Sequence, residues 1–218
     1  MKYRRPTYSL PLWAAILCGL AALLLVGCNA NKMNTASTRK YTEFITRYNI
    51  YFNGDKHYKE TLADMESKYE DDYSRFVMMH PIEAKADPKA PQPSGNFNRS
   101  IEKAQKAIQV RSIKKKPKRK SGKAMTPEYK EWLKRDEYNP FLHNAWMMMG
   151  RSQYYNGDFL GAASTFFYVT KHFTWLPTTV TDAKLWQAQS YLALDWLYEA
   201  ELIITRIKTD DLTTTQLR

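Results

Sequence analysis

Residues 146–169 place large and small side chains at spacings that suit two closely packed helices. The first half ends in Asn156-Gly157-Asp158, where Gly157 can adopt the positive φ that ends a helix and Asp158 can cap the next one. Small residues let two helix axes approach, and large residues fill the groove beside the crossing. The segment therefore predicts a helical hairpin. The residues that carry the pattern are Trp146, Gly150, Ala162, Phe166 and Val169.

A second copy of this pattern follows 38 residues later, with small and apolar residues at matching positions. Its corresponding residues are Ala188, Tyr191, Ala200 and Ile204. In spacing and in its small residues the pair resembles tetratricopeptide repeats, which we place at about 142–173 and 180–208 within residues 126–218. The alternative is an unrelated four-helix arrangement with the same pattern of small residues.

The rest of the body is also expected to be helical, because no segment alternates with period two for long enough to form a strand. Asn53-Gly54-Asp55 repeats the turn sequence and predicts a degenerate hairpin over residues 39–80. We expect a disordered Pro-rich linker over 81–97, a helix over 98–113 and a basic loop over 114–125. The predicted fold class is all-α, the start of an α-solenoid of tetratricopeptide hairpins.

The first thirty residues have the layout of a secretory signal, with positive charges followed by an uncharged apolar run from Leu10 to Val26. The run ends in Leu25-Val26-Gly27-Cys28, which resembles the bacterial lipobox. This predicts a signal peptide over 1–27, diacylglycerol and N-acyl lipid on Cys28, and a tether over 28–38. No acidic residue follows Cys28 directly, so the expected location is the periplasmic face of the outer membrane. The alternative is an uncleaved inner-membrane anchor, for which the run is short.

The positive charge of the chain is concentrated in one segment. The formal net charge is +11, and residues 114–123 hold seven lysines and arginines with no acidic residue. The segment contains no aromatic residue that could stack on single-stranded nucleic acid, so no nucleic-acid partner is expected. Three interpretations stay open: a solvated mobile connection, a contact with anionic head groups or lipopolysaccharide phosphates, and a protein-docking loop. Thr126-Pro127 then predicts the start of a helix.

The sequence carries none of the patterns that catalysis or cofactor binding requires. We find no phosphate-binding loop, zinc-ligand spacing or nucleophile elbow, and the four histidines are far apart. Two cysteines, Cys18 and Cys28, are too few for a disulfide scaffold or a cysteine metal site. We therefore expect a non-enzymatic protein with no catalytic, cofactor-binding or metal-binding residue and no small-molecule substrate.

The order of these features is similar to the N-terminal part of the tetratricopeptide-repeat outer-membrane lipoproteins of the type IX secretion and gliding machinery (the SprE and PorW kind). The resemblance covers most of residues 28–208. It implies a lipid-anchored adaptor that binds protein components of the secretion apparatus through its repeats. The segments that carry it are the lipobox, residues 48–54, residues 101–108, the basic loop, residues 144–146 and residues 182–189.

Two other functions stay open from the sequence. Outer-membrane nutrient-uptake lipoproteins also use tetratricopeptide hairpins, and they bind glycans through exposed aromatic residues, a role that Trp175 could fill here. A lipoprotein of the β-barrel assembly machinery would have a similar architecture. Both alternatives keep the lipid anchor on Cys28 and differ only in what the helical body binds.

Overall fold

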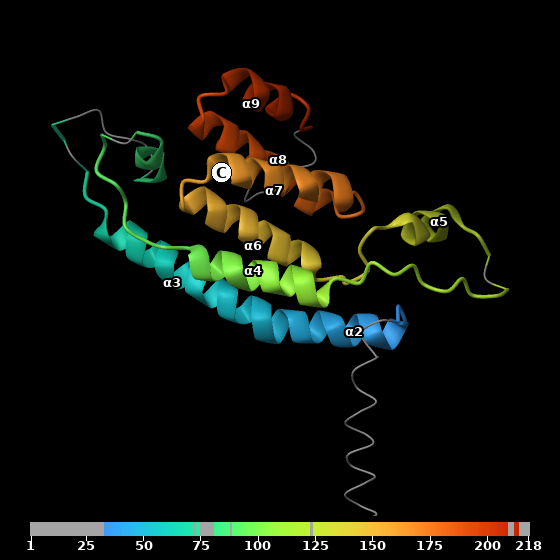
Figure 1. Cartoon of the computed structure of the whole chain (residues 1–218). Helices are drawn as coiled ribbons and strands as arrows, with labels where there is room; N and C mark the ends of the chain where they lie inside the picture. Colours follow the sequence, from blue (N-terminus) through green and yellow to red (C-terminus); the bar gives the residue numbers. More distant parts are fainter. Residues whose placement is uncertain are drawn as a thin grey trace, which may run out of the picture.

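The computed structural model of the chain describes residues 33–71, 73–74, 81–87, 89–122, 124–208 and 212–213 (Figure 1). These residues form helices, and no strand occurs among them, so the predicted all-α class is confirmed. Cys28 and the predicted signal peptide lie outside the described residues. The elements are α2 (Ala36–Ile45), the π-helix η2 (Thr46–Tyr51), α3 (Phe52–Lys68), the 3-10 helix η3 (Pro81–Ala86), α4 (Asn98–Arg111), α5 (Pro127–Lys134), α6 (Leu142–Tyr155), α7 (Phe159–His172), α8 (Pro177–Ala193) and α9 (Leu197–Ile204).

Six helices pack in chain order, each against the next: α3, α4, α6, α7, α8 and α9. In Figure 1 they form a stack from the long helix at the bottom to α9 at the top. In addition, α6 touches both α3 and α8. The helices α3, α6 and α8 therefore lie in series and share one face of the stack. The short helix α5 stands to one side, at the end of an excursion between α4 and α6.

The predicted hairpin over residues 39–80 is wrong. At the junctions between α2, η2 and α3, the cap residues Thr46, Tyr51 and Phe52 all have helical φ and ψ, so the three elements form one continuous helix. The segment Asn53-Gly54-Asp55 consequently lies inside a helix and makes no turn. A chain folding back at this point would bring Lys59 to the position that Ala162 occupies in the later hairpin.

The partner of α3 is α4, which supplies the missing small residues. Ser100, Ala104 and Ala107 are buried along α4. A Cβ added to Gly54 would lie 2.7 Å from Cε of Met148 in α6, and 3.0 Å from a Cβ in α4. The Ser100 hydroxyl donates a hydrogen bond to the Gly54 carbonyl oxygen, at 3.1 Å. Gly54 therefore permits a close helix crossing, which is a different role from the turn that the sequence predicts.

The segment 81–97 is packed at both ends, so its prediction as a disordered linker is also wrong. Ile82 in η3 is buried in the main core together with Phe159 and Phe166. At the other end Phe97 is fully buried, and its backbone N–H donates to Oδ1 of Asn156 at 2.9 Å. Burial of these apolar side chains holds the segment against the stack, although none of its described residues is in an α-helix.

The excursion that carries the basic loop has a buried carboxylate at its base. Glu137 accepts hydrogen bonds from the Ser112 hydroxyl at 2.5 Å and from the backbone N–H of Ile113 at 2.8 Å, where the excursion leaves the stack. It also accepts from the backbone N–H of Asn139 at 2.7 Å, where the chain returns. Beyond the loop, Thr126 caps α5 and Pro127 is its first residue, as the sequence predicts. The carboxylate thus joins the two ends of the excursion.

Candidate functional site

The residues predicted to pack the first repeat hairpin do so. A Cβ on Gly150 would lie 2.7 Å from the ring of Phe166, so the glycine is what lets α6 and α7 approach. Phe166 and Ala162 are fully buried. Trp146 is half-buried, and its ring stacks on Tyr168 with 4.1 Å between centroids. The turn residue Gly157 has φ of 84°, and Asp158 accepts a hydrogen bond from the backbone N–H of a residue three positions later, as expected of a cap.

The second hairpin follows its predictions except at its last position. Ala188 and Ala200 are buried at the crossing of α8 and α9. Tyr191 is half-buried and stacks on Trp196, with 5.6 Å between ring centroids. Ile204, the counterpart of Phe166, is 47% exposed, so its prediction as a packing residue is wrong. Ile204 lies at the end of α9, and no further described helix covers it.

The shared face of α3, α6 and α8 carries a groove made of two adjoining hollows, which we call the inner groove. The first hollow has a volume of about 380 Å³ and the second about 90 Å³. Tyr51, Asp55 and Asn144 line both, so these residues lie where the two hollows meet. The π-helix η2 contributes Tyr51 to this junction, and π-helical segments in other proteins often occur at functional sites.

The first hollow is the aromatic end of the inner groove. Tyr51 and Phe141 meet edge to face, with 4.9 Å between ring centroids. The guanidinium of Arg47 lies 5.3 Å from the Tyr48 ring and 5.7 Å from the Phe141 ring. Tyr48 and Phe52 also line the hollow and are 57% and 55% exposed. This end offers apolar surface, with the positive charge of Arg47 beside it and Asp55 where it meets the second hollow.

The second hollow is the charged end. Nη2 of Arg151 donates to Oδ2 of Asp182 at 2.5 Å, and this pair bridges α6 and α8. Nε of Arg151 is buried and has no hydrogen-bond partner. Burial raises the pKa of Tyr51 to about 12 and lowers the pKa of His143, so both side chains are neutral at pH 7. The charges that remain there belong to Arg151, Asp182 and Asp55.

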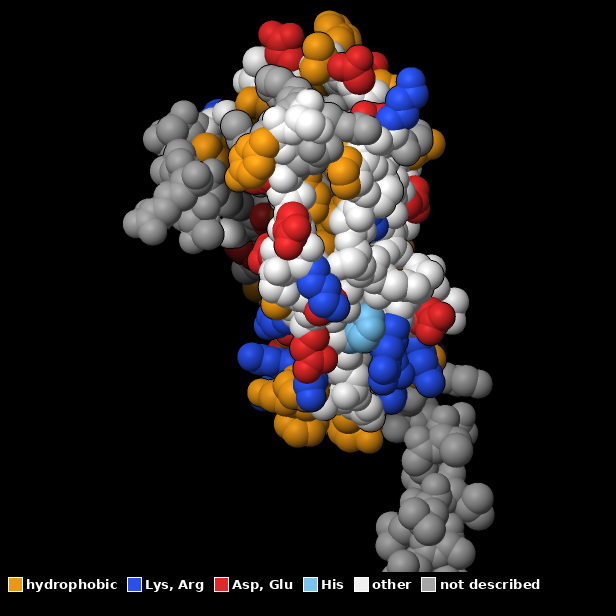
Figure 2. All heavy atoms as spheres, turned by 90° about the vertical axis from the view of Figure 1, so that its left-hand side faces the viewer, with side chains coloured by type: hydrophobic (Ala, Val, Ile, Leu, Met, Phe, Trp, Pro, Cys, Tyr) orange, Lys and Arg blue, Asp and Glu red, His pale blue; other side chains and the backbone are white. Residues whose placement is uncertain are grey.

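Exposed aromatic residues continue from the inner groove along the outside of the long helix. Tyr41, Phe44, Tyr48 and Phe52 recur at helical spacing and all are more than half exposed. Figure 2 shows hydrophobic side chains gathered at the bottom of the molecule, over the long helix, and again at the top, over α9. The exposed apolar residues of α9 and the preceding turn are Trp196, Leu197, Tyr198, Leu202 and Ile204.

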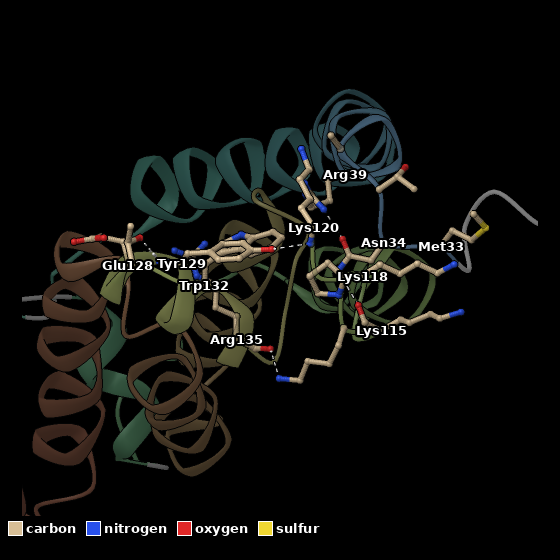
Figure 3. A pocket seen from close by; sticks show the side chains of 15 residues that line it. Met33, Asn34, Arg39, Lys115, Lys118, Lys120, Glu128, Tyr129, Trp132 and Arg135 are labelled. Atoms are coloured by element: carbon tan, nitrogen blue, oxygen red, sulfur yellow. Dashed lines mark hydrogen bonds between the residues drawn. The ribbon is translucent and has the colours of Figure 1, made fainter. Parts of the chain in front are cut away.

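A separate hollow of about 850 Å³, which we call the basic pocket, lies between the start of α2, the basic loop and α5. Figure 3 shows the side chains that these three segments contribute to it. Tyr129 and Trp132 stack with 5.7 Å between centroids and 14° between ring planes. The guanidinium of Arg39 lies 5.0 Å from the Trp132 ring. The cationic residues that line the pocket are Arg39, Lys115, Lys116, Lys118, Lys120 and Arg135, and the acidic residue is Glu128.

The sequence alone did not reveal either hollow. The basic loop has no aromatic residue of its own, but the structure brings Tyr129 and Trp132 of α5 against it. Their spacing of three on a helix that directly follows the lysine run was an available signal. The inner groove combines residues of three helices and left no local pattern. Trp175, considered for glycan stacking, is half-buried and has the Arg135 guanidinium 4.5 Å from its ring centroid.

Within the described part of the chain, no cluster of three or more histidine, cysteine, aspartate or glutamate side chains could hold a metal ion. None of the described helices has the length and apolar character needed to cross a bilayer. No protein-family model matches the sequence, and no curated protein is significantly similar to it.

Proposed function

We propose that this protein is a non-enzymatic, lipid-anchored scaffold that binds components of a bacterial type IX secretion and gliding apparatus. Acyl chains on Cys28 would fix it to the periplasmic face of the outer membrane, since several chains on one residue give stable anchoring. The helical stack would then present a surface for partner proteins. The inner groove is the observation that supports this proposal most.

The order of helix contacts supports a tetratricopeptide-type arrangement. In such arrays the first helices of successive hairpins lie side by side and line one face. Here α3, α6 and α8 have that relation, with α4, α7 and α9 as their second helices. In this proposal the first hairpin consists of α3 and α4, and the basic excursion is inserted between the first and second hairpins.

The chemistry of the inner groove fits a segment of a partner protein. Its aromatic end exposes Tyr48 and Phe52, and apolar patches of this kind mark protein-interaction sites. Its charged end holds Arg151 and Asp182, which can recognise polar groups of the same segment. An exposed apolar anchor beside a polar end is the usual composition of a protein interface.

The experiment that tests this function removes the aromatic end. We expect Tyr48→Ser with Phe52→Ser, in the full-length lipoprotein expressed in its own bacterium, to abolish co-purification of type IX translocon proteins and to reduce secretion of a type IX cargo. Both side chains are more than half exposed, so the substitutions should leave folding intact. Quantitative mass spectrometry of the purified membranes measures the loss.

Tyr73→Ser is the matched control, because Tyr73 is 83% exposed and lies outside the helical stack. It should retain all partners. The proposal fails if the Tyr48/Phe52 variant keeps the same partners as the wild type. Co-purification of the β-barrel assembly machinery, with no type IX component, would instead support the barrel-assembly alternative.

A further inference from the structure

We propose that the basic pocket binds the phosphate head group of an anionic phospholipid in the membrane to which the protein is anchored. The proposal rests on the lipid-anchored function above and adds a second, non-covalent contact with the bilayer. Four properties of the pocket carry it: its charge, its aromatic wall, its distance from the anchor and the hydrogen bonds that hold the loop in place.

The charge of the pocket matches an anion. Six cationic side chains line it against the single carboxylate of Glu128. Among the described residues, no carboxylate forms an ion pair with Lys115, Lys118 or Lys120. In Figure 3 the side chains of Lys115 and Lys118 extend to the same side as Met33. Each lysine near an anionic membrane surface contributes about 1 kcal/mol of attraction, a fivefold change in affinity.

The aromatic wall favours a lipid over a free phosphate ion. Tyr129 and Trp132 stack against each other beside the lysines, and Met33 and Pro117 add further apolar surface. A free phosphate would leave this surface in contact with water. A phospholipid would place its phosphate among the lysines and its glycerol and first methylene groups against the rings, as interfacial tyrosine and tryptophan side chains do in membrane proteins.

The position of the pocket places it close to the bilayer. Met33, which lines the pocket, is five residues after Cys28. An extended chain spans at most about 3.6 Å per residue, so the edge of the pocket at Met33 can lie no further than about 18 Å from an acylated cysteine. This limit is about two Debye lengths of 8 to 10 Å, so the tether allows the lysines to enter the region where the field of anionic head groups acts.

Hydrogen bonds hold the basic loop in place. Nδ2 of Asn34 donates to the Lys115 carbonyl oxygen at 2.7 Å, which ties the loop to the start of α2. Nζ of Lys116 donates to the carbonyl oxygens of Lys134 and Arg135 at the end of α5, at 3.1 and 3.0 Å. The basic loop is therefore held against α2 and α5, which distinguishes its lysines from those of a flexible basic tail.

Binding to vesicles tests the proposal without the covalent anchor. The mature chain from residue 28, with Cys28→Ser, is mixed with vesicles of phosphatidylcholine or of phosphatidylcholine with phosphatidylglycerol, and flotation measures the bound fraction. We expect binding only to the anionic vesicles. Replacing Lys115, Lys118 and Lys120 together by Gln should weaken it on the order of 100-fold, from about fivefold for each lysine.

The matched control removes the same net charge elsewhere. Lys56, Lys59 and Lys68 are exposed on α3 and each lies within 4 Å of a carboxylate oxygen, so their replacement by Gln should leave vesicle binding nearly unchanged. Equal loss in the two triple variants would overturn the proposal, because binding would then follow net charge alone. Equal binding to neutral vesicles would overturn it as well.

A soluble lipid tests whether the pocket is a discrete site. Calorimetry with dihexanoyl phosphatidylglycerol should give one saturable site that weakens at least tenfold with Trp132→Leu, whereas glycerol phosphate should bind far more weakly. Equal binding of the two ligands would show a free-phosphate site and overturn the proposal. The lysine variants should lose lipid binding and keep the partner proteins of the inner groove. A wild-type chain that keeps those partners but binds neither anionic vesicles nor the soluble lipid would contradict this inference alone.

Discussion

The tripeptide Asn-Gly-Asp occurs at residues 53–55 and again at 156–158, each time after two aromatic residues. At 156–158 the chain reverses between α6 and α7, and Gly157 adopts φ of 84°. At 53–55 the helix continues from Ala36 to Lys68. Identical local chemistry thus gives a turn in one place and a helix in the other.

The difference lies in what each following segment can pack against. After Asp158 the next turns carry Ala162 and Ala163, which are buried against the preceding helix. After Asp55 the corresponding turns carry Lys56 and Lys59, whose side chains are 63% and 71% exposed. A hairpin at residues 53–55 would have to bury these ammonium groups, and burial of an unpaired charge costs far more than a turn gains.

The largest expected effect comes from placing a proline shortly after each Asn-Gly-Asp segment, because the first turn of a helix accepts proline and a helix interior does not. Lys56→Pro should destabilise the protein by about 3 kcal/mol or more, because residue 56 lies in the interior of a continuous helix. Leu160→Pro is the control, since Leu160 is exposed in the first turn of α7, where proline is accepted. Urea unfolding followed by circular dichroism measures both. Equal stability of the two variants would place a turn at residues 53–55 after all.

The next largest effect is a difference in stability between alanine variants of the two glycines at helix crossings, Gly150 and Gly54. Gly150→Ala should cost about 1 to 3 kcal/mol, because the new methyl group would lie 2.7 Å from the ring of the fully buried Phe166. Gly54→Ala should cost less, because its closest neighbour is the terminal methyl of Met148, which can move, whereas the ring of Phe166 cannot. Thermal unfolding compares the two. A greater loss at Gly54 would contradict the assignment of the tighter crossing to Gly150.

These two regions show how far the sequence could predict the fold. The hairpin at residues 146–169 was predictable because its turn, cap and small residues all lie within the segment. The long helix was not, because its continuation depends on Ser100, Ala104 and Ala107 in α4, which follow some forty residues later. Lys59, at a position where the hairpin pattern requires a small residue, was the signal that pointed against a turn.

The two candidate sites were likewise predictable from the sequence only in part. The run of lysines in the basic loop was visible in the sequence, where an anionic membrane surface was one of three interpretations. The pocket was not predictable, because Arg39 and Trp132 meet through tertiary packing of segments that are far apart in the chain. The inner groove likewise depends on α3, α6 and α8 sharing one face. Charge is a local property of a sequence, whereas a hollow is a product of packing.

A smaller effect is expected at the turn glycine itself. Gly157→Ala should destabilise the protein by about 1 to 2 kcal/mol, the cost of holding a residue with a Cβ in the left-handed region. Gly157→Asn should cost less, because asparagine populates this region more readily. Equilibrium unfolding in urea distinguishes the two variants. An alanine variant as stable as the wild type would mean that this turn, too, can form without a positive φ.

The smallest effect concerns the two aspartates. Oδ1 of Asp158 accepts a hydrogen bond from the Gly161 backbone N–H at 2.9 Å, so Asp158→Ala should cost about 1 kcal/mol as a lost helix cap. Asp55 sits inside a helix and pairs with the exposed Lys59 at 2.7 Å, so Asp55→Ala should cost about 0.5 kcal/mol, the value of a helical ion pair four residues apart. Unfolding at low and high salt separates the two roles: added salt should shrink the cost of Asp55→Ala and leave most of the cost of Asp158→Ala. If Asp55→Ala proved the more costly at both salt concentrations, Asp55 would be acting as a cap, and the continuous helix could not be correct.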